Sequence, residues 1–147
     1  MIRYKIYNAY SEMSKEERDE IVDFLHTHLE KFRDEKPDID KAIAYSLKEN
    51  AAPGGFVLTG HVDDNMVGAV VVNRTGMEGY IPENILVYIA VDSKMRGKGY
   101  GKELMKKAIE LAEGNIALHV EPDNPAKFLY EKLGFTNKYL EMRLTKA

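Results

Sequence analysis

The sequence predicts an α/β fold with a mixed sheet, built as one domain over residues 1–147 around a central parallel β-α-β crossover. Three observations lead to this prediction. Strand-like and helical runs follow one another in the order β-α-α-β-β-β-α-β-α-β-β. One helix stands between two apolar strands, a connection that a parallel pair needs. The length of 147 residues suits a single core, and 44% hydrophobic with 31% charged residues is typical of a folded chain.

The N-terminal third of the chain predicts a strand followed by two helices. The strand is Arg3–Tyr7. Ser14 and Glu17 have the spacing of a capping box, in which each side chain accepts a hydrogen bond from the other residue's amide. Behind them, apolar residues recur at helical spacing over about 18 residues. A second helix is expected from about Asp38 to Asn50, and the Ala-Pro-Gly-Gly sequence that follows ends it.

The middle of the chain predicts three strands with no helix between them. Gly55–His61 and Met66–Asn73 flank a polar turn, so they are expected to form a hairpin. A loop over Arg74–Glu83 leads to Ile85–Val91, which is almost wholly apolar. A strand of this composition is expected to be covered on both faces.

The C-terminal part predicts the crossover and the last elements of the fold. A glycine-rich turn leads into a helix at Tyr100–Glu113, and the strand Asn115–Val120 follows. This crossover is expected to be right-handed. The last expected elements are a helix that starts near Pro125, a short strand around Phe135 and another at Tyr139–Leu144.

Charge and composition exclude several classes of function. Lys and Arg number 21 against 24 Asp and Glu, and this net charge of −3 gives no reason to expect a nucleic-acid partner. The absence of cysteine excludes disulfides, cysteine-ligated zinc and a thiol nucleophile. His26 and His28 are two residues apart on a predicted helix and cannot face one metal ion together, so no metal is expected.

No segment predicts a membrane location. The longest apolar runs are seven residues, whereas a membrane-spanning helix needs about 20. The first residues carry charges with no apolar run behind them, so no signal peptide is expected. The sequence therefore predicts a soluble, cytoplasmic protein.

Residues 92–107 are the part of the sequence that indicates chemistry. They include six basic and two acidic residues, a local balance of +4. The chain passes here from a strand through Gly97, Gly99 and Gly101 into a helix, whose first amides suit a phosphate group. A Walker-type loop is excluded because Glu103 stands where Ser or Thr is needed, and the glycine spacing differs from that of a dinucleotide fold. A different anion site is therefore expected.

Two motifs give the chain a family resemblance. Arg96-x-x-Gly99-x-Gly101 follows the apolar strand and looks like the acetyl-CoA loop of the GNAT N-acetyltransferase superfamily. The stretch from Leu118 to Phe135, which includes Asn124 and Tyr130, is similar to the second signature of that superfamily at the expected separation. By motif the resemblance covers residues 85–135. It implies a GNAT-like domain that uses acetyl-CoA as cosubstrate.

The resemblance implies a role for each matching residue. Tyr130 would contact the cofactor and act as the general acid that protonates the departing thiolate. Asn124 would bond the cofactor or fix the strand-to-helix turn. Backbone groups at Ala90 and Val91 would hold the pantetheine arm and the thioester carbonyl. The residues that would hold the pyrophosphate are Arg96, Gly97, Lys98, Gly99, Tyr100, Gly101 and Lys102.

These residue types suit direct transfer of an acetyl group to a primary amine. Preorganised backbone amides stabilise the negative charge that develops on the carbonyl oxygen. A phenol can hydrogen-bond or protonate the leaving thiolate. No covalent intermediate is needed, in agreement with the missing cysteine and the missing G-x-S-x-G pattern. The alternative is a non-catalytic module on the same fold that binds or senses acyl-CoA.

The sequence leaves the general base and the acceptor open. Some members of the superfamily carry Glu at about the position of Val87, and valine cannot take a proton. The candidates here are Tyr88, His119, Glu121 and Glu83, or a chain of water molecules. A protein N-terminus, a lysine, a polyamine or a small amine all fit as acceptor, and a homodimer is common among similar proteins.

Overall fold

The computed structural model describes residues 1–146, which form five strands, four α-helices and two short 3-10 helices. The strands are β1 (Arg3–Tyr7), β2 (Gly55–Val62), β3 (Asn65–Arg74), β4 (Asn84–Val91) and β5 (Ile116–Leu118). The α-helices are α1 (Lys15–His28), α2 (Lys36–Ser46), α3 (Tyr100–Leu111) and α4 (Ala126–Lys132). The 3-10 helices are η1 (Glu30–Phe32) and η2 (Ser93–Met95).

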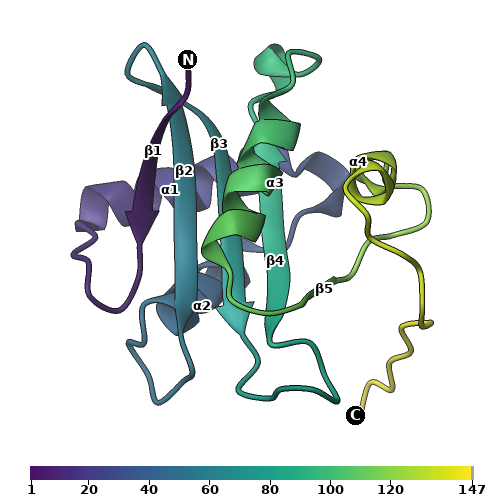
Figure 1. Ribbon diagram of the computed structural model, residues 1–147. Coiled ribbons are helices and arrows are strands. Elements are labelled where there is room, and N and C mark those ends of the chain that lie inside the picture. The colour runs from purple at the N-terminus through teal and green to yellow at the C-terminus, as the bar shows by residue number, and fades with distance from the viewer. Residues whose placement is uncertain (147) are drawn as a thin grey trace.

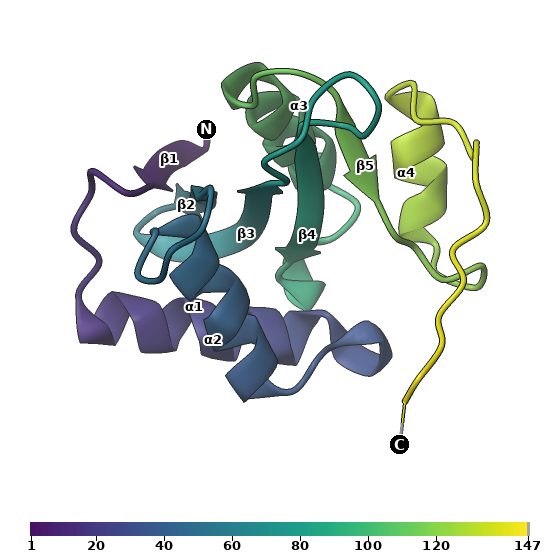
Figure 2. The same cartoon turned by 90° about the horizontal axis from the view of Figure 1, so that it is seen from below.

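The strands form one sheet in the order β1-β2-β3-β4-β5. Neighbours from β1 to β4 are antiparallel, and β5 runs parallel to β4 after the crossover through α3. Figures 1 and 2 show α1 and α2 on one face of this sheet, α3 on the other, and α4 beyond β5. The predicted mixed α/β sheet with a parallel β-α-β crossover is confirmed.

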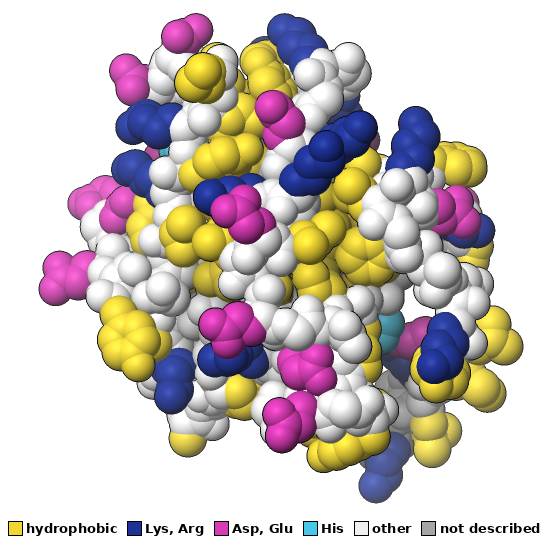
Figure 3. Space-filling view, viewed as in Figure 1, with side chains coloured by type: hydrophobic (Ala, Val, Ile, Leu, Met, Phe, Trp, Pro, Cys, Tyr) yellow, Lys and Arg dark blue, Asp and Glu magenta, His cyan; other side chains and the backbone are white. Residues whose placement is uncertain are grey.

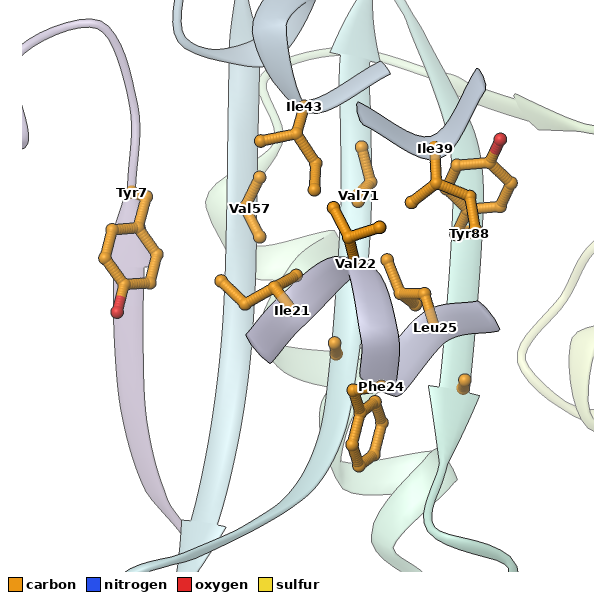
Figure 4. Packing of buried hydrophobic residues seen from close by; sticks show 12 residues of the cluster. Tyr7, Ile21, Val22, Phe24, Leu25, Ile39, Ile43, Val57, Val71 and Tyr88 are labelled. Carbon is orange, nitrogen blue, oxygen red and sulfur yellow. The ribbon is translucent and has the colours of Figure 1, made fainter. Parts of the chain in front are cut away.

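The face under α1 and α2 holds the larger part of the apolar core (Figure 4). α1 begins at the predicted capping box, where Ser14 Oγ accepts from the amide of Glu17 at 3.0 Å and Glu17 Oε1 accepts from the amide of Ser14 at 2.8 Å. The helix ends at His28 and is shorter than the apolar spacing predicts, because Glu30 has a φ of +56°. A residue in this left-handed region cannot continue a right-handed helix.

Two glycines bring α3 close to the opposite face of the sheet. Gly60 and Gly68 are paired across β2 and β3. A Cβ at Gly68 would lie 2.2 Å from Leu104 Cδ1, and a Cβ at Gly60 would lie 3.1 Å from Leu104 Cδ2. The buried Leu104 of α3 therefore occupies the space that side chains on these strands would fill. This close packing fixes the start of α3 beside the C-terminal end of β4.

A bulge at Val87 separates β4 from β5. In the pairing of β3 with β4, Val72 faces Leu86 and Val71 faces Tyr88, so Val87 is the extra residue. β4 pairs with β5 only over Asn84–Leu86, and the two strands diverge beyond this point (Figure 2). Over the rest of β4, the backbone groups on this edge face no neighbouring strand within residues 1–146.

The prediction of a strand around Phe135 is wrong, because Phe135 completes the end of α4. Gly134 has a φ of +101°. Its amide donates to Glu131 O at 3.1 Å, and the amide of Phe135 donates to Tyr130 O at 3.0 Å. These two bonds and the contact between the Tyr130 and Phe135 rings, whose centroids are 5.9 Å apart, make a Schellman motif. The amides of Gly134 and Phe135, which would pair with a neighbouring strand, donate instead to carbonyl groups at the end of α4.

The predicted strand at Tyr139–Leu144 is also absent from the structure. The segment alternates apolar and polar residues, but no strand pairs with it within residues 1–146. Leu140, Met142 and Leu144, which would form its apolar face, are between 85% and 88% exposed. The alternation of apolar and polar residues predicts which side chains would share a face of a strand. A strand also needs a partner to pair with, and the alternation does not predict one.

Candidate functional site

The loop between β4 and α3 presents backbone amides to open space. Asp92 Oδ1 accepts from the amide of Lys94 at 2.9 Å and so starts η2. Gly97 and Gly99 have φ values of +82° and +85°, a conformation that glycine adopts without strain. No other group lies within 4 Å of the position of a Cβ at either glycine. Gly99 is the N-cap of α3 and gives no side chain to its first amides, which remain available to an anion.

Gly101 marks the place where three elements meet. A Cβ at this position would lie 3.5 Å from Leu129 of α4 and 3.6 Å from Val91 of β4. The start of α3, the end of β4 and the middle of α4 are thus next to one another. Of the remaining predicted loop residues, Lys98 and Lys102 are exposed and Tyr100 is half-buried. Figure 3, in the orientation of Figure 1, shows Lys and Arg side chains flanking this end of α3.

The edge of β4 that diverges from β5 continues into this loop. Val91 packs on the α3 side of the sheet and Ala90 on the α1 side, so their backbone groups lie in the plane between the two layers. The structure therefore brings together the predicted strand edge, the predicted glycine loop and the helix that carries Tyr130.

Tyr130 differs from the buried Tyr7 and Tyr88 in the hydrogen bonding of its hydroxyl. The hydroxyl of Tyr7 donates to Glu17 Oε2 at 2.6 Å, and that of Tyr88 donates to Asp34 Oδ2 at 2.6 Å. The Tyr130 ring is equally buried, but its hydroxyl bonds to no other residue among 1–146. Every fully buried side-chain oxygen in this range has a hydrogen-bond partner, so the Tyr130 hydroxyl is not fully buried. The hydroxyl of Tyr130 is therefore reached by solvent, and it is available to a ligand.

Burial affects the protonation of the Tyr130 hydroxyl, and the Schellman motif affects its direction. Desolvation raises the pKa of its hydroxyl to about 12. The phenol thus keeps its proton at neutral pH and can act as a hydrogen-bond donor. The contact with Phe135 holds one side of the ring, so the direction of the hydroxyl is fixed by the end of α4.

Asn124 fixes the turn from β5 into α4. Its Oδ1 accepts from the amide of Ala126 at 3.0 Å, and this bond satisfies one of the unpaired donors at the helix start. Of the two roles that the resemblance implies for Asn124, the structure shows the one within the turn.

The structure places the four candidate bases in different surroundings. Tyr88 faces the α1 side of the sheet, opposite to Tyr130. Burial and the bond to Asp34 raise the pKa of Tyr88 above its ordinary value, so it keeps its proton and cannot serve as a base near neutral pH. His119 and Glu121 are exposed, and His119 Nδ1 lies 3.9 Å from Glu141 Oε1.

Glu83 lies at the start of β4, at the opposite end of the strand from the glycine loop. Its Oε1 accepts from the amide of Asn115 at 2.7 Å, and its Oε2 accepts from the amide of Gly79 at 3.0 Å. These two amides hold the pKa of the carboxyl below its ordinary value of 4.5. Glu83 therefore joins two loops and is not next to the other candidate site residues.

We expect Glu83→Gln to lower the melting temperature at pH 7 and to leave the turnover number unchanged. Glutamine has only one acceptor oxygen, which is uncharged, so it can accept from only one of the two amides. Because the folded pKa is lowered, the carboxylate stabilises the fold above pH 4.5, and this contribution is lost as the pH falls through the lowered value. Thermal melts of both proteins should therefore converge at acid pH. Unchanged melts together with a large loss of turnover would make Glu83 the base.

A hollow in the surface lies away from this site. A cavity of about 430 Å³ opens between α1 and α2, with acidic side chains on its walls. Asp40 binds Arg18 at 2.7 Å, Asp23 binds Lys36 at 2.9 Å and Asp19 binds Lys15 at 3.0 Å, so all three of its carboxylates already have partners. Among residues 1–146, no group of three acidic or histidine side chains is placed to hold a metal ion. In the same range, no helix is long and apolar enough to cross a membrane.

Comparison with protein families decides the assignment. Residues 9–135 match the family described as the acetyltransferase (GNAT) family. The chain belongs to this family. The match extends from the segment before α1 to the Schellman motif after α4, so it includes the glycine loop, Asn124, Tyr130 and the four candidate bases.

Individual GNAT relatives resemble the chain over different lengths. N-alpha-acetyltransferase 30 of Xenopus laevis is 38% identical over 79 residues, which is 50% of this chain and 29% of that protein. The chain thus matches less than a third of the length of this relative. The structure of PH1933 from Pyrococcus horikoshii OT3 is 25% identical, with a TM-score of 0.68, and the alignment covers 95% of this chain and 93% of the other.

A third relative was solved with CoA. The Bacillus subtilis acetyltransferase in complex with CoA is 22% identical and has a TM-score of 0.63. The alignment covers 91% of this chain and 76% of that one. At this identity the likeness shows that the fold is shared.

Proposed function

We propose that this protein transfers the acetyl group of acetyl-CoA to a primary amine by direct attack. The observation that carries the proposal is the hydroxyl of Tyr130, which bonds to no other residue among 1–146 and is reached by solvent, on a ring that is buried beside the end of β4 and the start of α3. The open space at Gly97 and Gly99 supports it, because phosphate groups can approach the amides there. The Bacillus subtilis acetyltransferase, which shares this fold and was solved in complex with CoA, supports CoA as the carrier of the acetyl group.

In the proposed reaction, the amine nitrogen attacks the thioester carbon while the carbon–sulfur bond breaks. Backbone groups of Ala90 and Val91, on the edge that diverges from β5, hold the thioester and stabilise the charge on its oxygen. The amides from Arg96 to Lys102 hold the pyrophosphate. The proton of the amine leaves to water or to a base outside the described contacts, and the electron pair of the broken bond leaves on sulfur.

Tyr130 assists the departing sulfur. Its pKa of about 12 lies above the ~8.5 of an ordinary thiol, so complete proton transfer to the thiolate would cost free energy. A hydrogen bond from the phenol to the developing thiolate avoids most of this cost. We therefore assign to Tyr130 the role of a donor that strengthens its bond as sulfur becomes negative.

The acceptor that deserves the first test is the α-amino group of a peptide. The support for this choice is the name of the Xenopus laevis relative, N-alpha-acetyltransferase 30, with which the chain shares 38% identity over 79 residues. The experiment incubates the protein with acetyl-CoA, a panel of peptides with different first residues, lysine and polyamines. Released thiol reports turnover, and mass spectrometry of the products locates the acetyl group.

A non-catalytic acyl-CoA-binding module remains the second candidate. The observation that favours it is the state of β4, where Val87 cannot take a proton and the Tyr88 hydroxyl is already bonded to Asp34. Binding of acetyl-CoA without thiol release across the whole panel would support this reading over the enzyme.

We expect acetyl-CoA to raise the melting temperature clearly more than adenosine does at equal concentration. A ligand that binds only the native state stabilises it in proportion to RT ln(1 + [L]/Kd). The pyrophosphate of acetyl-CoA contacts the loop amides, and adenosine has no group to replace it. Thermal melts with each ligand check this prediction. Equal shifts would contradict the assignment of the loop as an anion site.

A further inference from the structure

The glycine loop is attached to the end of α1 by three hydrogen bonds from its first residues. The amide of Ser93 donates to His28 Nδ1 at 3.1 Å. Arg96 Nη2 donates to the backbone oxygen of His28 at 2.6 Å, and Arg96 Nη1 donates to Glu30 Oε1 at 2.8 Å. We call these four residues, His28, Glu30, Ser93 and Arg96, the α1 latch.

The end of α1 is chemically suited to receive this loop. The last carbonyl groups of a helix have no partner within the helix, and His28 O is one of them. A cation beside them is favoured by the helix dipole, and Arg96 supplies it. Glu30 directs its carboxylate to Arg96 from a backbone with a φ of +56°, a conformation that non-glycine residues adopt at a cost.

The imidazole of His28 is held in one orientation. Its side chain is 15% exposed, and its ring lies 4.5 Å from that of Phe24 on the preceding turn of α1. Because Nδ1 accepts from the amide of Ser93, the proton of the neutral ring is on Nε2, which faces Asp92 Oδ2 at 3.9 Å. Asp92 is fixed in turn, since its own amide donates to Val67 O at 2.9 Å.

We propose that His28 and Glu30 are positioning residues for the cofactor loop. They hold the loop from Ser93 to Arg96, and this fixes the direction in which the amides of the following glycines point. The inference rests on the proposed function, because it assumes that these amides bind the pyrophosphate. It also changes the role of Arg96, whose side chain anchors the loop to α1 and does not serve as a phosphate ligand.

Substitutions of His28 test the acceptor atom itself. His28→Phe keeps the ring against Phe24 and removes Nδ1. His28→Asn places an oxygen at nearly the position of Nδ1, and His28→Gln places it one atom further out. We expect His28→Phe and His28→Gln to weaken acetyl-CoA binding by about 5- to 10-fold, the worth of a shielded hydrogen bond, and His28→Asn to restore most of it.

The measurements are the dissociation constant by calorimetry and the separate values of KM and kcat. A positioning role raises KM for acetyl-CoA and changes kcat little. The same three substitutions at His26, two residues earlier and on another face of α1, serve as matched controls. Equal affinity for the Phe, Asn and Gln variants of His28, or an equal loss at His26, would overturn the proposal.

A double-mutant cycle tests how Arg96 acts. If Arg96 anchors the loop through Glu30, then Glu30→Ala and Arg96→Ala each weaken acetyl-CoA binding, and the double variant is no weaker than Arg96→Ala alone. If Arg96 binds the phosphates directly, Glu30→Ala frees its charge, and binding is unchanged or tighter. The second result would overturn the proposal.

Amide hydrogen exchange of the ligand-free protein separates this inference from the proposed function. We expect the amides of residues 93–99 to exchange faster in His28→Phe than in the wild type, and His28→Asn to restore their protection. If the exchange of these amides is the same in His28→Phe as in the wild type, the proposed role of the α1 latch is wrong, even where acetyl-CoA binds. Faster exchange in a protein that binds no acetyl-CoA would confirm the attachment of the loop to α1 and reject the proposed function.

Discussion

Replacement of Gly99 by aspartate should abolish acetyl-CoA binding while the domain stays folded. Aspartate tolerates the left-handed backbone better than most residues, and it is a favourable N-cap. Its carboxylate would accept from the first amides of α3, occupy the open space at this position and repel the phosphates. With two or more charge-assisted hydrogen bonds lost, we expect an affinity at least about 100-fold weaker. Calorimetry with a folded variant checks the prediction.

Two variants separate charge from backbone strain. Gly99→Asn has the same size and the same tolerance of positive φ without the charge, so its loss of affinity should be much smaller. Gly79 has a φ of +77° and no group within 4 Å of a Cβ, as at Gly99, but it lies in the loop between β3 and β4. Gly79→Asp should therefore strain the backbone to a similar extent and leave acetyl-CoA binding intact. Wild-type affinity in Gly99→Asp would exclude Gly99 from the site.

Tyr130→Phe should lower kcat at least about 30-fold and leave the affinity for acetyl-CoA nearly unchanged. The substitution keeps the ring against Phe135 and removes only the unpartnered hydroxyl. A donor that acts mainly on the departing thiolate contributes to the transition state and little to the ground state. General-acid assistance is typically worth about 10²–10⁴-fold, and water can replace part of it. The measurement needs an accepted amine and conditions in which chemistry limits the rate.

Tyr7→Phe is the matched control for this substitution. Tyr7 is buried on β1, and its hydroxyl is bonded to Glu17, so its loss should change stability and not the chemical step. If kcat of Tyr130→Phe equals that of the wild type, Tyr130 is a packing residue with a polar tip. The non-catalytic acyl-CoA-binding module would then be the better description of the protein.

The parts of the fold that short stretches of sequence determine were predicted well. The capping box of Ser14 and Glu17 depends on residues three apart, and α1 begins where they predict. The path from β4 through a glycine loop into α3 depends on glycines, which adopt the required φ without strain. The Schellman motif could also have been predicted, since Gly134 and Phe135 follow an apolar helix in the order that the motif requires.

Contacts between distant residues could not be predicted from the sequence. The bond of Tyr88 to Asp34 joins residues 54 apart, and that of Ser93 to His28 joins residues 65 apart. No local pattern marks His28 or Glu30, because a histidine and a glutamate at the end of a helix are ordinary. The divergence of β4 from β5 depends on the bulge at Val87, which is defined only by the pairing with β3.

The C-terminal segment leaves apolar side chains in solvent, where another chain could contact them. Tyr139–Leu144 alternates apolar and charged residues and has no proline, and its two charges cancel, so a partner strand would receive an apolar face from it. β5 stands at the end of the sheet order, and an open strand edge can accept such a segment from another chain. We therefore expect concentrated protein to self-associate through this segment. Lysine in place of Leu140 and Met142 would interrupt this route without altering the core, because both side chains lie in solvent.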